Sequence, residues 1–115
     1  MRVLKILYVL SLSFIVSCSF GNSATVTISN ESGQLLKQLQ VGVFGKKKSI
    51  INLKNGESAV LVFRNLSDSH YTVNGELENS ALFNGDFGYV IHGMDFTASF
   101  RLKEGGKIEF TSNAT

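Results

Sequence analysis

The 115-residue chain contains no proline, no tryptophan and a single cysteine. One cysteine cannot form an internal disulfide, so packing and hydrogen bonds must stabilise whatever fold the chain adopts. The chain also has little net charge, because eleven basic residues face nine acidic ones. Two of the basic residues, Arg2 and Lys5, precede the first apolar run, and without them nine basic residues balance nine acidic ones. This balance disfavours nucleic-acid binding, which needs a basic surface.

Length and apolar content restrict the chain to one small domain. A chain of 115 residues has room for a single core, which excludes a multidomain enzyme. Hydrophobic residues make up 43% of the chain and charged residues 17%, and this ratio favours a packed core over a disordered segment. Residues 25–111 contain no internal repeat, low-complexity tract or linker.

The first 17 residues have the layout of a secretory signal peptide. A short positive segment at residues 1–5 precedes an apolar stretch at residues 6–16, and small residues follow at positions 17–19. A permanent transmembrane helix needs about twenty apolar residues, and serines interrupt this stretch before it reaches that length. We therefore expect residues 1–17 to direct export and to be removed.

The only cysteine lies at the end of this segment, in the sequence Ile15-Val16-Ser17-Cys18. These four residues resemble the lipobox of bacterial lipoproteins, with isoleucine in place of the usual leucine. The resemblance implies that the nucleophilic thiolate of Cys18 accepts a diacylglyceryl group and that acyl chains such as palmitate hold the protein on a membrane. Residues 18–24 would then form the lipid-attachment cysteine and its tether.

The residue after the cysteine bears on the membrane that receives the protein. In lipoproteins an aspartate at this place favours inner-membrane retention, whereas this chain has Ser19. The resemblance therefore implies the outer membrane, facing the periplasm. The alternative is that Cys18 is an ordinary small residue in a signal that is cleaved after Ser19 or Ala24.

Residues 25–111 show the pattern of short strands separated by turns. Apolar and polar residues alternate with a period of two, and glycine- and asparagine-rich clusters interrupt them. The expected strands are 25–29, 36–44, 49–53, 58–64, 71–77, the pair 81–87 and 88–91, 96–102, and 107–111. With no convincing amphipathic helix, this pattern predicts an all-β fold, a small immunoglobulin-like antiparallel β-sandwich, followed by a frayed tail at 112–115. The domain resembles other short exported bacterial proteins with such sandwiches.

Two segments carry more specific expectations. Ala59–Phe63 has no polar face, which predicts a central strand covered on both sides. Lys46–Lys48 is the one basic run, and together with Gly45 it is expected to form a charged turn at Gly45–Lys48. Such a run discourages edge pairing, or alternatively contacts anionic lipid headgroups or an acidic partner.

The densest group of functional side chains lies between Asn84 and Phe96. If this segment is an exposed loop, its aromatic, sulfur-containing and charged residues form a candidate partner-binding surface. The candidates are Asp86, Phe87, Tyr89, His92 and Met94. The alternative is that Gly85, Gly88 and Gly93 mark bulges or turns, with Phe87 and Tyr89 pointing into the core.

Catalytic and metal-binding patterns are weak. Asp86, His92 and Asp95 mix carboxylate and imidazole ligands, but their spacing matches no defined metal site. His70 and His92 are the only histidines, and neither belongs to a recognisable catalytic arrangement. We therefore expect no metal, no cofactor and no enzymatic activity.

These observations predict a small exported envelope protein, held to the membrane by lipid at Cys18, that acts as a protein-binding or assembly module. The alternative function is that of an inhibitor or immunity-type protein, which blocks an envelope hydrolase through a loop at Gly85–Asp95.

Overall fold

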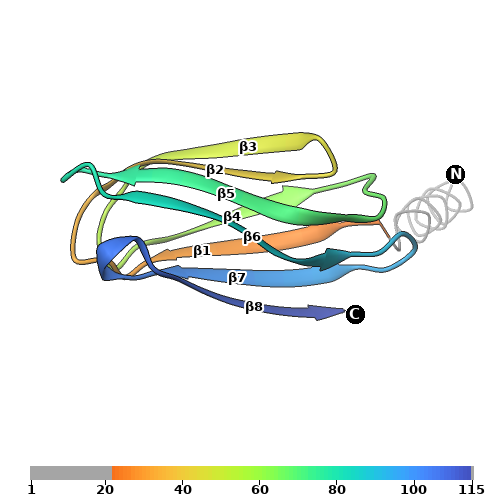
Figure 1. Ribbon diagram of the computed structural model, residues 1–115. Helices are drawn as coiled ribbons and strands as arrows, with labels where there is room; N and C mark the ends of the chain where they lie inside the picture. Colours follow the sequence, from red (N-terminus) through yellow and green to blue (C-terminus); the bar gives the residue numbers. More distant parts are fainter. Residues whose placement is uncertain (1–21, 115) are drawn as a thin grey trace, which may run out of the picture.

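The computed structural model describes residues 22–114, which form two four-stranded sheets packed face to face (Figure 1). Its elements are β1 (Ala24–Asn30), β2 (Leu36–Val43), β3 (Lys46–Leu53), β4 (Ser58–Phe63), β5 (Ser69–Leu77), β6 (Leu82–Val90), β7 (Phe96–Leu102), η1 (Glu104–Gly106) and β8 (Ile108–Ala114). The prediction of an all-β, antiparallel β-sandwich is confirmed. The predicted signal segment and Cys18 lie outside the described residues. Within residues 22–114, no helix could span a membrane.

The two sheets have the strand orders β4-β1-β7-β8 and β3-β2-β5-β6. Every pairing is antiparallel except that of β1 with β7, where Val26 lies opposite Ala98. Two parallel strands need a long connection between them, and here β2 to β6 provide it. This division of strands, four and four, differs from the four and three of immunoglobulin constant domains. It leaves β3, β4, β6 and β8 at the edges of the sheets.

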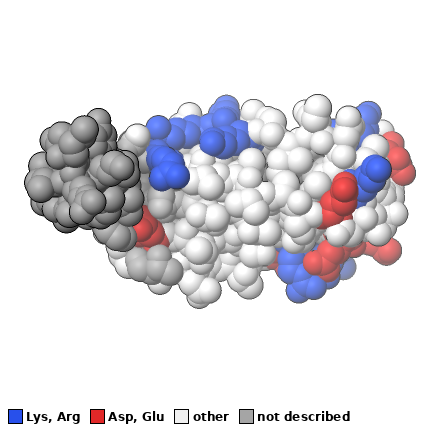
Figure 2. Space-filling view, turned by 180° about the vertical axis from the view of Figure 1, so that it is seen from behind, with Lys and Arg blue, Asp and Glu red and all other residues white. Residues whose placement is uncertain are grey.

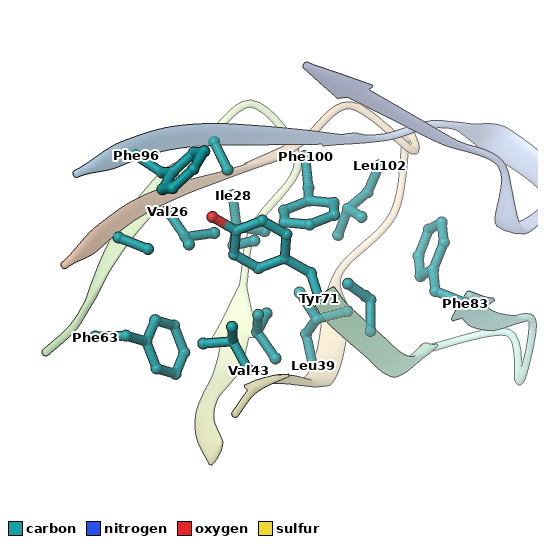
Figure 3. Close-up of a cluster of buried hydrophobic side chains, with 14 of the residues drawn as sticks. Val26, Ile28, Leu39, Val43, Phe63, Tyr71, Phe83, Phe96, Phe100 and Leu102 are labelled. Atoms are coloured by element: carbon teal, nitrogen blue, oxygen red, sulfur yellow. The ribbon is translucent and has the colours of Figure 1, made fainter. Parts of the chain in front are cut away.

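The core fills the space between the two sheets with side chains that alternate along each strand (Figure 3). An aromatic cluster lies on the side of the core that is bordered by β6 and β8, where the Tyr71 ring of β5 meets Phe100 of β7 with their centroids 5.8 Å apart. Phe87 and Phe110 flank Phe100, at 5.4 and 5.0 Å. Edge-to-face and tilted pairs of this kind stabilise a core beyond the area that they bury. Burial also raises the pKa of the Tyr71 hydroxyl to about 12, because the phenolate would lose its hydration.

β4 occupies the edge of its sheet, so the prediction of a central strand at Ala59–Phe63 is wrong. The inner face of the strand packs against the core through Leu61 and Phe63, as expected for an apolar run. Its outer face is open, however, and the Val60 side chain is 60% exposed. A run of apolar residues without alternation does not show whether a strand is central or at an edge of its sheet. That depends on which strands it pairs with in the fold.

The turn between β2 and β3 consists of Phe44 and Gly45, with φ angles of 49° and 71°. Positive φ at both central residues is typical of the tight turns that join antiparallel strands. The turn expected at Gly45–Lys48 therefore includes Gly45, but Lys46 already begins β3, so the expectation is wrong for the three lysines. Because β3 is an edge strand, its three exposed lysines oppose pairing with another chain.

β6 is one continuous strand and not the two short strands predicted. Gly88 adopts a φ of 53° in its middle, and the register slips there, so that Tyr71 faces Phe87 while Ser69 faces Val90. One extra residue on β6 makes this a β-bulge. A Cβ atom at Gly88 would lie 2.7 Å from the Phe110 ring, so the bulge also lets the aromatic cluster close.

β8 is longer than the predicted strand at 107–111. It pairs with β7 as far as Ala114, which lies opposite Phe96. The expectation of a frayed tail is therefore wrong for residues 112–114, because the ladder of β7 continues to support them. Between β7 and β8, residues 104–106 form the short 3-10 turn η1.

The end of the sandwich at which β1 stops is here called the distal end. Hydrogen bonds of a buried amide and of a charged carboxylate connect its loops and strands. The Asn30 amide donates to the carbonyls of Gln34 and Leu53, at 2.8 and 2.9 Å, and accepts hydrogen bonds from Ser32. Both its donor and its acceptor atoms are satisfied, so its burial costs little.

Glu31 is the centre of an ion-pair network at the same end. Its carboxylate accepts two hydrogen bonds from Arg101, at 2.8 and 2.9 Å, and one from Lys103 at 2.6 Å. These bonds lower the pKa of Glu31 from 4.5 to about 2, since they favour the ionised form. The network joins the β1–β2 connection to β7.

We predict that this network makes the fold acid-sensitive. A carboxyl group with a lowered pKa stabilises the folded state above about pH 4.5, and the contribution disappears as the pH falls toward 2. The urea midpoint of the protein should therefore fall over this range, and Glu31→Gln should flatten the dependence. Glu104→Gln, at an exposed position in η1, is the control and should leave the profile unchanged.

Candidate functional site

The opposite end of the sandwich, here called the proximal end, is where the described chain begins. It comprises Asn22, the turn Phe44–Gly45 and the two loops 64–68 and 91–95 (Figure 1). The carbonyl of Asn22 accepts a hydrogen bond from the Leu66 N–H, and its side-chain oxygen accepts one from the Gly93 N–H, both at 3.0 Å. The start of the domain is thus bonded to both loops.

Short hydrogen bonds also hold the loop 91–95 in place. The Asp68 carboxylate accepts the His92 N–H at 2.7 Å, which joins this loop to loop 64–68. The Asp95 carboxylate accepts the N–H and the hydroxyl of Ser23, at 3.1 and 2.8 Å. Sequence reasoning missed Asn22 and Asp68 as positioning residues, because each acts on a segment distant in the chain.

Apolar side chains are exposed around this loop. Tyr89 at the end of β6 is 77% exposed, Ile91 is 51% exposed and Met94 is 38% exposed. Phe44 in the β2–β3 turn is 47% exposed, and the His92 side chain is also exposed. Tyr89, His92 and Met94 therefore lie on the surface, as a partner-binding role requires, and that role stays a prediction. Ile91 and Phe44 were not among the sequence candidates.

The other two candidates lie elsewhere. Phe87 points into the aromatic cluster, so its assignment to an exposed surface is wrong, whereas the inward position considered for it is right. The same inward position is wrong for Tyr89. Asp86 is exposed on the outer face of β6, where its carboxylate lies 3.7 Å from Nε2 of His70. The bulge at Gly88 explains why the side chains on either side of it diverge.

Basic side chains lie beside the apolar ones. Figure 2 shows Lys and Arg gathered along one side of a face near the proximal end, with a few acidic atoms at the same end, and both signs of charge close together at the distal end. The basic residues concerned are Lys46, Lys47 and Lys48 at the start of β3 and Arg64 directly after β4. The Lys48 ammonium lies 5.7 Å from the centre of the Phe63 ring, a cation–π contact. The proximal end thus combines apolar and positively charged groups.

No metal centre is formed by residues 22–114, since no three acidic, histidine or cysteine side chains converge there. Asp86, His92 and Asp95 serve separate contacts. A shallow hollow of about 330 Å³ lies on the outer face of the second sheet, and its polar lining consists of Gln38, Gln40, Ser49, Asn74, Glu76 and Asn84.

Comparisons with known proteins support the fold alone. No protein-family model matches the chain, and no curated protein does. A protein from Eubacterium rectale solved by NMR is similar over 78% of this chain and 87% of its own, with a TM-score of 0.57 and 17% identity. A non-hemolytic pneumolysin from Streptococcus pneumoniae strain ST306 has a TM-score of 0.44 and 6% identity over 83% of this chain. The cytotoxin suilysin from Streptococcus suis has a TM-score of 0.40 and 12% identity over 81% of this chain. This chain spans 24% and 23% of the two toxins.

The opposite directions of Phe87 and Tyr89 predict opposite effects on stability. Phe87→Ala should lower the free energy of unfolding by about 2 kcal/mol or more, because it removes a ring from the aromatic cluster. Tyr89→Ala should change it by less than about 0.5 kcal/mol, because the ring is exposed. Urea titration of both variants measures the difference, and equal losses would contradict the register of β6.

Proposed function

We propose that this chain is an exported, lipid-anchored envelope protein whose β-sandwich binds another protein. The anchor part of the proposal rests on the lipobox-like sequence that ends at Cys18 and on Ser19, which favours the outer membrane facing the periplasm. The binding part rests on one observation, the position of the apolar strand β4 at an open sheet edge.

The beginning of the domain suits an anchor at Cys18. Asn22, which is bonded to both proximal loops, follows Cys18 by four residues. Four residues reach at most about 14 Å when extended. A lipid on Cys18 would therefore hold the sandwich close to the membrane by its proximal end.

We predict that Cys18→Ala removes the lipid and releases the protein from membranes. In cells fed a radioactive fatty acid, the unchanged protein should carry label and sediment with membranes. The variant should carry no label and should leave the membrane fraction. Cys18→Ser, which keeps the size of the side chain but lacks the thiol, should behave like Cys18→Ala. Unlabelled wild-type protein would contradict the anchor.

β4 has the composition of a central strand but lacks a neighbour on one side. Its six residues contain no charge, and Val60 and Val62 lie on the outer face. In an antiparallel ladder, every second residue directs its N–H and C=O groups toward the neighbouring strand. The Asn30 N–H donates to the Glu57 carbonyl, so Glu57 is one of the residues that face β1. The N–H and C=O groups of Ser58, Val60 and Val62 therefore point away from β1, toward the open edge. Edge strands usually carry a charge or a bulge that prevents further pairing, and β4 carries neither within Ser58–Phe63.

These features suit a partner that adds an extended strand to the sheet. Backbone hydrogen bonds would supply affinity, and apolar side chains beside Val60 and Val62 would supply specificity. The other edge strand on this side of the sandwich, β3, is protected by Lys46–Lys48. The favoured function is therefore a binding or assembly module.

The inhibitor alternative is less well supported by the geometry. It needs a loop that can enter the cleft of a hydrolase, and the loop was expected at Gly85–Asp95. Residues 85–90 of this segment belong to β6, and hydrogen bonds to Asp68, Asn22 and Ser23 hold the remainder against the domain. A short, bonded connection of this kind does not protrude as an inhibitory loop would.

We predict that Val60 lies at the partner interface. A photo-crosslinking amino acid at position 60 of the full-length protein should yield a specific adduct with another protein in cells, detected by its increased mass. The same amino acid at the exposed Thr111, on the far edge strand of the same sheet, is the control and should give none. Adding Glu57→Ala should leave the adduct intact, whereas Val62→Lys should abolish it. Absence of any adduct at position 60 would contradict the binding role of β4.

A further inference from the structure

Most of the exposed large apolar side chains gather at the proximal end. Seven such side chains are exposed among residues 22–114, and four of them are Phe44, Tyr89, Ile91 and Met94. The remaining three lie singly on β3, β4 and β6. Single exposed apolar residues are ordinary on a protein surface, but a group at one end of a domain marks a contact surface.

The positive charges beside this group are not neutralised by the domain itself. Among residues 22–114, none of Lys46, Lys47, Lys48 and Arg64 forms an ion pair, whereas Arg101 and Lys103 at the distal end are paired with carboxylates. The carboxylates of Asp68 and Asp95, which are also at the proximal end, accept hydrogen bonds from the loops. Lys48 does lie over the Phe63 ring, but this contact does not neutralise its charge, so all four basic groups can still attract negative groups outside the protein.

The position of the chain start indicates what these groups meet. Asn22, at which the described chain begins, lies at the proximal end, and a lipid attached at Cys18, four residues earlier, would lie within about 14 Å of it. Salt screens charge interactions at distances beyond about 8 Å at physiological ionic strength, so a basic group must lie close to the headgroups to be attracted to them. The short tether would hold the basic groups of the proximal end that close to the membrane.

We infer that the proximal end is a second membrane contact, which inserts Tyr89, Ile91 and Met94 at the lipid surface and places Lys46–Lys48 and Arg64 on anionic phospholipid headgroups. Tyrosine suits this position because its ring is apolar and its hydroxyl stays in water. The inference rests on the proposed lipid anchor. It orients the sandwich with its distal end away from the membrane and leaves the edge of β4 open to a partner.

The test places a fluorescent probe at each end of the full-length, acylated protein. Tyr89→Cys and Met94→Cys are labelled with a polarity-sensitive maleimide dye, and Leu82→Cys, on the same strand as Tyr89 but at its distal end and 68% exposed, is the matched control. The proteins are bound to vesicles of phosphatidylethanolamine with phosphatidylglycerol that contain a nitroxide-labelled lipid. Dyes at positions 89 and 94 should shift to the blue and be quenched, and the dye at position 82 should do neither.

Charge is tested with two triple variants that have equal net charge. Replacing Lys46, Lys47 and Lys48 by Gln should abolish the part of the quenching that depends on phosphatidylglycerol. Replacing Lys37, Lys54 and Lys107, at the distal end, by Gln should preserve it. Both variants keep the lipid anchor, so both should remain bound to the vesicles.

The outcomes separate the two proposals. If Cys18 carries no acyl group, the anchor fails and the second contact fails with it. If the protein is acylated and bound but the dyes at positions 89 and 94 remain as exposed to water as the dye at position 82, the anchor stands and the second contact is refuted. Equal quenching in the two triple variants would refute the role of Lys46–Lys48.

Discussion

The pairing of β1 on both of its sides is the constraint on which the rest of the structure depends. β1 forms an antiparallel ladder with β4 and a parallel ladder with β7, with Val26 between Leu61 and Ala98. Between β1 and β7 the chain forms β2, β3, β5 and β6 of the other sheet and β4 beside β1, so the parallel ladder joins the two ends of this long connection and closes the sandwich. It also places Asn22 among the proximal loops, where its hydrogen bonds hold residues 66 and 93.

The two ends of the sandwich differ because of this arrangement. At the distal end, Asn30 and the ion pairs of Glu31 satisfy the polar groups of the connections within the domain. At the proximal end, around Asn22, apolar side chains are exposed beside Lys46–Lys48, which form no ion pair within residues 22–114. The ion pairs of Glu31 thus distinguish the distal end, and a group of exposed apolar side chains distinguishes the proximal end.

Several parts of the candidate site could be predicted from residue patterns, and others could not. Alternation along Tyr71–Leu77 indicated which residues of β5 face the core, because side chains on a strand point to opposite faces in turn. The same rule failed at Phe87 and Tyr89, because the bulge at Gly88 adds one residue between them and alters the alternation. Asp68 and Asn22 could not be found as loop supports, since their contacts depend on strands that meet only in the fold.

The sequence by itself determined that this chain is an all-β sandwich and where most of its strands lie, because local alternation and turn residues act over a few neighbouring positions. Only the tertiary structure decided that Ala59–Phe63 lies at an edge and that Lys46–Lys48 begins a strand. It also decided that Tyr89, Ile91 and Met94 share one end with the start of the domain. These features depend on which strands become neighbours, and strand pairing joins residues that are far apart along the chain.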